Sequence, residues 1–168
     1  MKFLFCLLSI LILNKECDAA KSSSIDSENN SIVTKSSPTE KIQDENMIIS
    51  YSAITRGTRK IITVSKSETI IEDSRAKTPK QTFSTNEKDW NAIKTLVSEI
   101  DIKNIPNLKP PSTKSHYDGA LAGSLKIELA SKTGSVETMS PTFDHGNPPK
   151  EISELVNKLL SLTEKGGK

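Results

Sequence analysis

The clearest structural pattern in the chain stands in residues 122–130, whose sequence is AGSLKIELA. Three apolar side chains alternate there with Lys126 and Glu128. Successive side chains of a strand point to opposite faces of a sheet, so this alternation predicts a strand with one buried face. A short turn sequence containing Gly134 separates it from a second such segment, residues 135–142. The two segments together predict a β-hairpin.

Further strands are expected earlier in the chain, where short runs of β-branched residues are bounded by turn residues. These runs are residues 47–52, 60–65, 69–72 and 81–84. With the hairpin they give five or six strands.

Two amphipathic helices are expected, one after each group of strands. The apolar residues of the first recur at helical spacing from Trp90 to Ile100, and those of the second from Ile152 to Leu160. For the first helix we expect Ser84 as the N-cap, with Glu87 three residues later. For the second we expect Asn147 as the N-cap and Pro148 at the first helical position. The fold class predicted is α+β: a single antiparallel sheet of five or six strands with two helices on one face, in strands-helix-strands-helix order.

The first 46 residues differ in character from the rest. Residues 1–19 have the order of a secretory signal: a basic start, an apolar run of about 11 residues and a polar end. Residues 20–46 are polar and serine-rich, which predicts a disordered spacer. The folded domain is then expected over residues 47–168. Signal cleavage could release a soluble protein, or Cys17 could become a lipid anchor, and both alternatives stay open.

Composition excludes several classes of protein. The chain has 23 basic and 21 acidic residues, a net charge of +2, so we expect no nucleic-acid partner. Its two cysteines lie before residue 18, which excludes a disulfide scaffold and a cysteine zinc cluster. No cofactor is expected, and contact with a membrane is expected only through Cys17. Residues 56–80 carry seven basic and three acidic side chains. This basic run indicates a solvated edge of the sheet, and the alternative is a surface that attracts anionic polymers of the cell envelope.

Two loops hold both histidines of the chain. His116, Tyr117, Asp118 and Gly119 lead into the predicted hairpin, and Asp144, His145, Gly146 and Asn147 leave it. Because antiparallel pairing returns the chain to the end where it started, the two loops should lie side by side near the second helix.

Three interpretations of these loops compete. In the first, Asp118 and Gly119 make a turn, Asp144 and His145 hydrogen-bond to the backbone, and Gly146 takes a positive φ before the helix. In the second, four side chains form a site for zinc or another divalent ion: His116, Asp118, Asp144 and His145. In the third, the loops form a ligand-binding or protein-binding patch. Its residues would be His116, Tyr117, Asp118, Asp144, His145 and Asn147.

Three segments resemble motifs of an uncharacterised family of small exported bacterial proteins. They are WNAIKTLVSEIDIKNIPNLKPPS at 90–112, HYDGALAG at 116–123 and FDHGNPP at 143–149. The resemblance spans about residues 48–162, and it implies export and a shared fold but no activity.

Export and the absence of motifs for nucleophilic or phosphate chemistry favour a non-catalytic binding module of the cell envelope. We expect a monomer that is periplasmic, secreted or tethered to the outer surface, with a protein or envelope component as its partner. The alternatives are a small metal-dependent enzyme built on the paired loops and an inhibitor of a secreted enzyme.

Overall fold

The computed structural model describes residues 46–131 and 134–164, and all of them belong to the second of the two units into which the chain divides, Pro38–Lys168. The predicted signal segment, Cys17 and all but the last residue of the predicted spacer lie outside the described residues.

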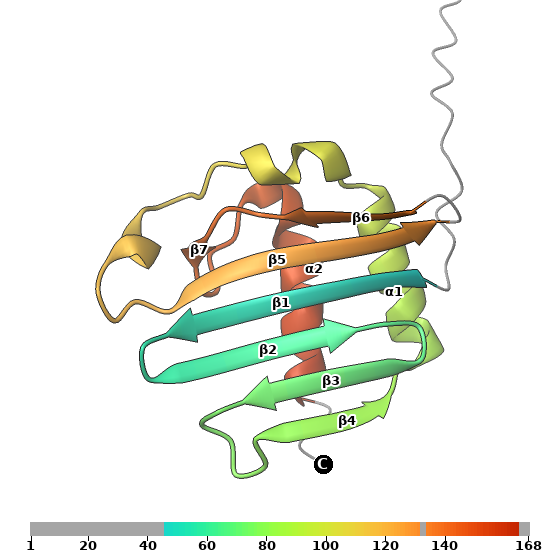
Figure 1. Ribbon diagram of the computed structural model, residues 1–168, viewed down its shortest axis with the longest axis horizontal. Helices are drawn as coiled ribbons and strands as arrows, with labels where there is room; N and C mark the ends of the chain where they lie inside the picture. Colours follow the sequence, from blue (N-terminus) through green and yellow to red (C-terminus); the bar gives the residue numbers. More distant parts are fainter. Residues whose placement is uncertain (1–45, 132–133, 165–168) are drawn as a thin grey trace, which may run out of the picture. The chain divides into compact units, whose positions relative to one another are not determined.

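One antiparallel sheet organises the described part of the chain (Figure 1). Its strands are β1 (Met47–Thr55), β2 (Thr58–Val64), β3 (Glu68–Asp73), β4 (Lys80–Ser84), β5 (Ala122–Ser131), β6 (Gly134–Met139) and the short β7 (Phe143–Asp144). The order is β4-β3-β2-β1-β5-β6, and β7 pairs with the start of β5. The first strand therefore lies at the centre, where it pairs with β2 on one side and β5 on the other.

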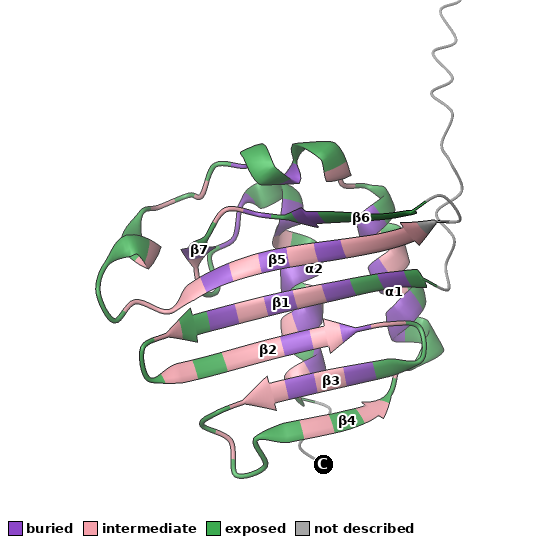
Figure 2. Ribbon diagram, viewed as in Figure 1, coloured by how far each residue is buried: buried purple, intermediate pink, exposed green. Residues whose placement is uncertain are grey.

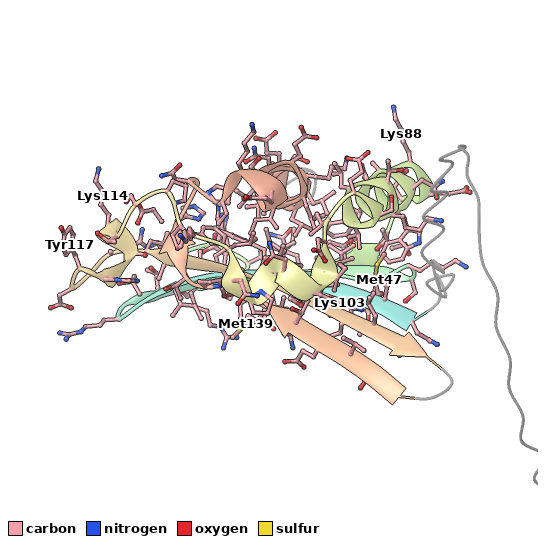
Figure 3. All side chains as sticks on the ribbon, turned by 90° about the horizontal axis from the view of Figure 1, so that it is seen from above. Met47, Lys88, Lys103, Lys114, Tyr117 and Met139 are labelled. Carbon is pink, nitrogen blue, oxygen red and sulfur yellow. The ribbon has the colours of Figure 1, made fainter. Side chains whose placement is uncertain are left out.

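Two α-helices, α1 (Glu87–Ser98) and α2 (Lys150–Ser161), cover one face of this sheet (Figures 1 and 3). Three short 3-10 helices complete the described elements: η2 (Ile102–Asn107), η3 (Lys114–His116) and η4 (Leu162–Glu164). The segment α1–η2–η3 carries the chain from edge strand β4 back to the far side of β1, where β5 begins.

The core lies between the sheet and the helices. Every second residue of β1 is buried there, which Figure 2 shows as an alternation along the central strands. Trp90, Ile93 and Val97 of α1 are buried, as the helical spacing predicts. From α2, the buried residues are Ile152, Leu155, Val156 and Leu159. Full burial of one such aliphatic side chain stabilises the fold by about 1.5–3 kcal/mol.

The α+β class and the antiparallel sheet are confirmed, but details of the prediction are wrong. Counting β7, the described sheet has seven strands rather than five or six. Asp144 was expected in a loop and Phe143 was assigned to no element, because so short a strand has no periodicity to detect. The predicted order of elements also leaves out the three 3-10 helices.

Both predicted N-caps are wrong as well. Ser84 is the last residue of β4, and Asn86 caps α1 by accepting a hydrogen bond from the Lys88 N–H at 2.8 Å. Helix α2 begins only at Lys150, after Pro149. A proline disfavours helical backbone in the residue before it, so Pro149 keeps Pro148 out of the helix.

Among the described residues, no helix has the length and apolar character that crossing a membrane requires.

Candidate functional site

The two histidine-bearing loops meet at one end of the sheet, as the hairpin predicts. Ala122 of β5 pairs with Asp144 of β7, and the His145 N–H donates to the Leu121 carbonyl at 3.0 Å. The β1–β2 and β3–β4 turns lie at this same end (Figure 1). We call it the loop end of the sheet. Figure 3 shows Tyr117 and Lys114 there, far from Lys88 of α1.

The side chains of the predicted site point to different partners, although their backbones lie close. His116 and Asn147 are exposed, and Tyr117 is 69% exposed. Asp118 pairs with Arg56 of the β1–β2 turn at 3.1 Å. The remaining two, Asp144 and His145, form hydrogen bonds with side chains elsewhere in the chain.

The predicted metal site is not formed in the described part of the chain. No group of three or more His, Cys, Asp or Glu side chains there is arranged to hold a metal ion. The Asp144 carboxylate instead accepts a hydrogen bond from the Ser112 hydroxyl at 2.5 Å. Asp118 is drawn away toward Arg56, so the four predicted ligands do not converge.

His145 contacts a buried tyrosine that the sequence did not single out. The hydroxyl of Tyr51, on the central strand, lies 2.6 Å from His145 Nδ1, and the two ring centroids are 6.0 Å apart. Phe143 also packs against the Tyr51 ring, with a centroid distance of 6.2 Å. The Tyr51 side chain is fully buried, whereas His145 is exposed to solvent.

The surroundings of this pair decide where its protons lie. Burial raises the pKa of Tyr51 to about 12, although a hydrogen bond from the backbone of Gly146 acts in the opposite direction. Burial, and after it the positive charge of Lys60, lower the pKa of His145. At neutral pH the phenol therefore keeps its proton, and the imidazole tautomer sets which of the two groups donates the hydrogen bond. In the tautomer in which Tyr51 donates to Nδ1, the imidazole hydrogen is on Nε2 and that nitrogen is a donor.

A pocket opens beside His145 at the loop end. It has a volume of about 210 Å³ and brings together β1, β2, the end of β3, the β3–β4 turn and the two paired loops. Its lining residues are Ala53, Thr58, Arg59, Lys60, Asp73, Arg75, Leu121 and His145.

Several charged side chains of the pocket are already engaged in ion pairs within the protein. The Arg59 guanidinium pairs with Glu72, so it is already engaged. Lys60 lies 3.2 Å from Asp73, and Asp73 also accepts the Arg75 N–H at 2.9 Å. Both contacts lower the pKa of Asp73, and the hydrogen bond from the Arg75 backbone has the largest effect. In the part of the chain that the structure describes, the Arg75 guanidinium forms no ion pair within 4.0 Å.

Sequence reasoning found His145 but missed Tyr51, Lys60 and Arg75 as its neighbours. Tyr51 belongs to an ordinary alternating strand and lies 94 residues from His145 in sequence. Lys60 and Arg75 belong to the basic run 56–80, which was interpreted as a solvated edge. The strand alternation could have placed Lys60. It lies two and four residues before the buried Ile62 and Val64, so its side chain is on the same, helix-bearing face of the sheet.

No protein-family model matches the chain, and no curated protein matches it at a significant level. The resemblance to small exported bacterial proteins therefore stays a prediction.

Proposed function

We propose that this protein is an exported, non-catalytic binding module of the cell envelope, and that it binds its partner at the loop end of the sheet. The partner is a protein or another envelope component. Residues 1–19 direct export, and the chain is either released or anchored through Cys17.

The observation that supports this proposal is the arrangement of the loop end. The pocket at this end is lined by residues of β1, β2, the end of β3, the β3–β4 turn and the β7–α2 turn, and by Leu121 just before β5. The β1–β2 turn lies at the same end of the sheet, as do η3 and the turn that follows it (Figure 1). Binding residues are concentrated on loops that a rigid scaffold positions, and the sheet with its two helices provides such a scaffold.

Two side chains at the rim fit contact with a partner. Tyr117 presents an exposed ring with a polar tip, a residue type enriched at protein interfaces. Arg56 of the neighbouring turn is also exposed and reaches Asp118 across the gap between the loops. Arginine and tyrosine are the residue types that most often dominate binding energy.

Site-specific photocrosslinking from the full chain in the cells that express it tests the position of the binding surface. We expect a photoreactive residue at Tyr117 to give a discrete crosslinked product, and the same residue at Ser67 to give none. Ser67 is exposed in the β2–β3 turn, at the opposite end of the sheet, and so serves as the matched control. Equal products from both positions, or products from Ser67 alone, would contradict the proposal.

Export is tested separately. Cell fractionation should place the processed chain outside the cytoplasm, with an N-terminus at Ala20 for the released form. Incorporation of a labelled fatty acid that disappears in the Cys17→Ser variant would instead establish the anchored form. Retention of the unprocessed chain in the cytoplasm would refute export.

A further inference from the structure

We propose that the pocket at the loop end is a site for a phosphate group, bound by Lys60, Arg75 and His145. This inference rests on the proposed function, because it names the ligand chemistry of the same end of the molecule. It would make the protein a binder of phosphorylated envelope components.

The three donors reach the pocket from three different elements. Lys60 comes from β2, Arg75 from the β3–β4 turn and His145 from the β7–α2 turn. Lys60 and His145 are close enough that the ammonium charge lowers the pKa of the imidazole. An anion between them would relieve this repulsion, which is the physical reason to expect an anion there.

Charge favours an anion as well. The Arg59 guanidinium is engaged by Glu72. The groups that remain are two cations, Lys60 and Arg75, one carboxylate, Asp73, and the His145 imidazole. Asp73 already accepts from Lys60 and from the Arg75 backbone, so its charge is partly satisfied within the turn. The Arg75 guanidinium forms no ion pair within 4.0 Å among the described residues, and its charge helps to lower the pKa of Asp73.

The types of donor match a phosphate. The planar fork of a guanidinium binds two oxygens of a phosphate, an ammonium supplies a point charge, and imidazole Nε2 supplies a further N–H. Thr58 Oγ1, in the wall of the same pocket, is buried without a hydrogen-bond partner. A buried hydroxyl in that state is a group that a bound ligand can satisfy.

The size of the pocket limits the ligand. Its volume of about 210 Å³ is below the roughly 300–1,000 Å³ of sites that enclose a whole drug-sized ligand. The pocket therefore holds one phosphate group, and the rest of a larger molecule would lie over the exposed loops. The phosphate could belong to a soluble sugar or polyol phosphate, or to a lipid headgroup.

Titration of the full chain with inorganic phosphate, followed by NMR of the His145 ring, tests the inference. We expect saturable shifts of the His145 signals and a rise in the pKa of its imidazole, because a bound anion favours the charged ring. Arg75→Gln and Lys60→Gln should each weaken binding by about tenfold, the loss of one charge-assisted contact. Lys88→Gln, on the exposed face of α1, is the matched control and should leave binding unchanged (Figure 3).

If Lys60→Gln unfolds the protein because Asp73 loses its partner, the exposed Arg75 still provides the test. Glycerol phosphate, and vesicles with and without phosphatidic acid, then distinguish a soluble phosphate from a lipid headgroup. Absence of saturable shifts with inorganic phosphate, or equal weakening by Lys88→Gln, would overturn the phosphate site. Crosslinking from Tyr117 would be unaffected by that result, so the two proposals can fail independently.

Discussion

At the scale of single residues, Gly123 controls how closely the Tyr51 and Phe143 rings approach the backbone of β5. A Cβ atom at this position would lie 2.8 Å from Phe143 Cε2 and 3.0 Å from the Tyr51 hydroxyl oxygen. Both rings are fully buried, so neither has room to withdraw. The packing beneath His145 therefore depends on the absence of a side chain at Gly123.

We predict that Gly123→Ala destabilises the protein by about 1–3 kcal/mol, the usual consequence of overpacking a core. Denaturant-induced unfolding measures this change. The control is Gly57→Ala in the β1–β2 turn, where a Cβ would meet no atom within 4 Å. Equal stability of the two variants would show that the rings move aside freely.

The ionisation of Tyr51 gives a second prediction at this scale. Its pKa is raised by burial from 10.0 to about 12, so folding favours the neutral phenol. The resulting stabilisation is fully present below pH 10 and is lost as the pH rises from 10 to 12. We expect ultraviolet titration of the folded protein to show a tyrosine that ionises at about pH 12. The Tyr51→Phe variant should lack this step, and an unchanged curve in that variant would assign it elsewhere.

At the scale of elements, an ion pair joins the two helices on the covered face of the sheet. Lys158 Nζ of α2 donates to Asp89 Oδ1 of α1 at 2.8 Å. The Asp89 side chain is only 8% exposed, so its charge depends on partners within the protein. This contact therefore links α2 to α1 in addition to their packing on the shared core.

We predict that Lys158→Met lowers the free energy of unfolding by up to about 3 kcal/mol, because it removes the Lys158 ammonium from the buried Asp89 carboxylate. Addition of Asp89→Asn should recover part of the loss, since a neutral amide depends less on a neighbouring cation than a buried carboxylate does. Thermal and denaturant unfolding of the single and double variants measure both effects. Lys88→Met, on the exposed side of α1, should change stability little, and a loss of similar size there would contradict the assignment.

At the scale of the whole molecule, the two faces of the sheet differ. The face toward α1 and α2 is apolar, whereas the opposite face carries hydroxyl side chains that bond across strands. Ser52 Oγ and Ser124 Oγ are 2.8 Å apart, and Ser50 Oγ and Thr63 Oγ1 are 3.3 Å apart. Both pairs are half-buried, so the core of the described residues lies on the helix side alone.

Because all described core residues lie at or beyond Met47, a chain that begins at residue 46 should unfold like the full one. We expect its melting temperature to change by less than about 2 °C, which corresponds to a change of less than about 1 kcal/mol in the free energy of unfolding. Differential scanning calorimetry of the shortened and full chains checks this. A fall of many degrees would show that the preceding residues contribute to the stability of the fold.

Much of the architecture was predictable from local patterns. The alternation around Lys126 and Glu128 predicted β5, and the helical spacing from Trp90 predicted α1. The hairpin also predicted that the two histidine loops meet, because antiparallel pairing alone brings its open ends together. The caps of both helices were not predicted correctly, since several residues near each helix start could serve and packing selects among them.

The sequence by itself determined the six longer strands and the two α-helices, because the period of apolar residues is a local property of the chain. Only the tertiary structure decided that β5 lies beside β1, and hence that Tyr51 meets His145 across 94 residues of sequence. It likewise gathered Lys60, Arg75 and His145 around one pocket. Periodicity defines the face on which a side chain points, but the neighbour it meets there depends on how all strands and helices pack together.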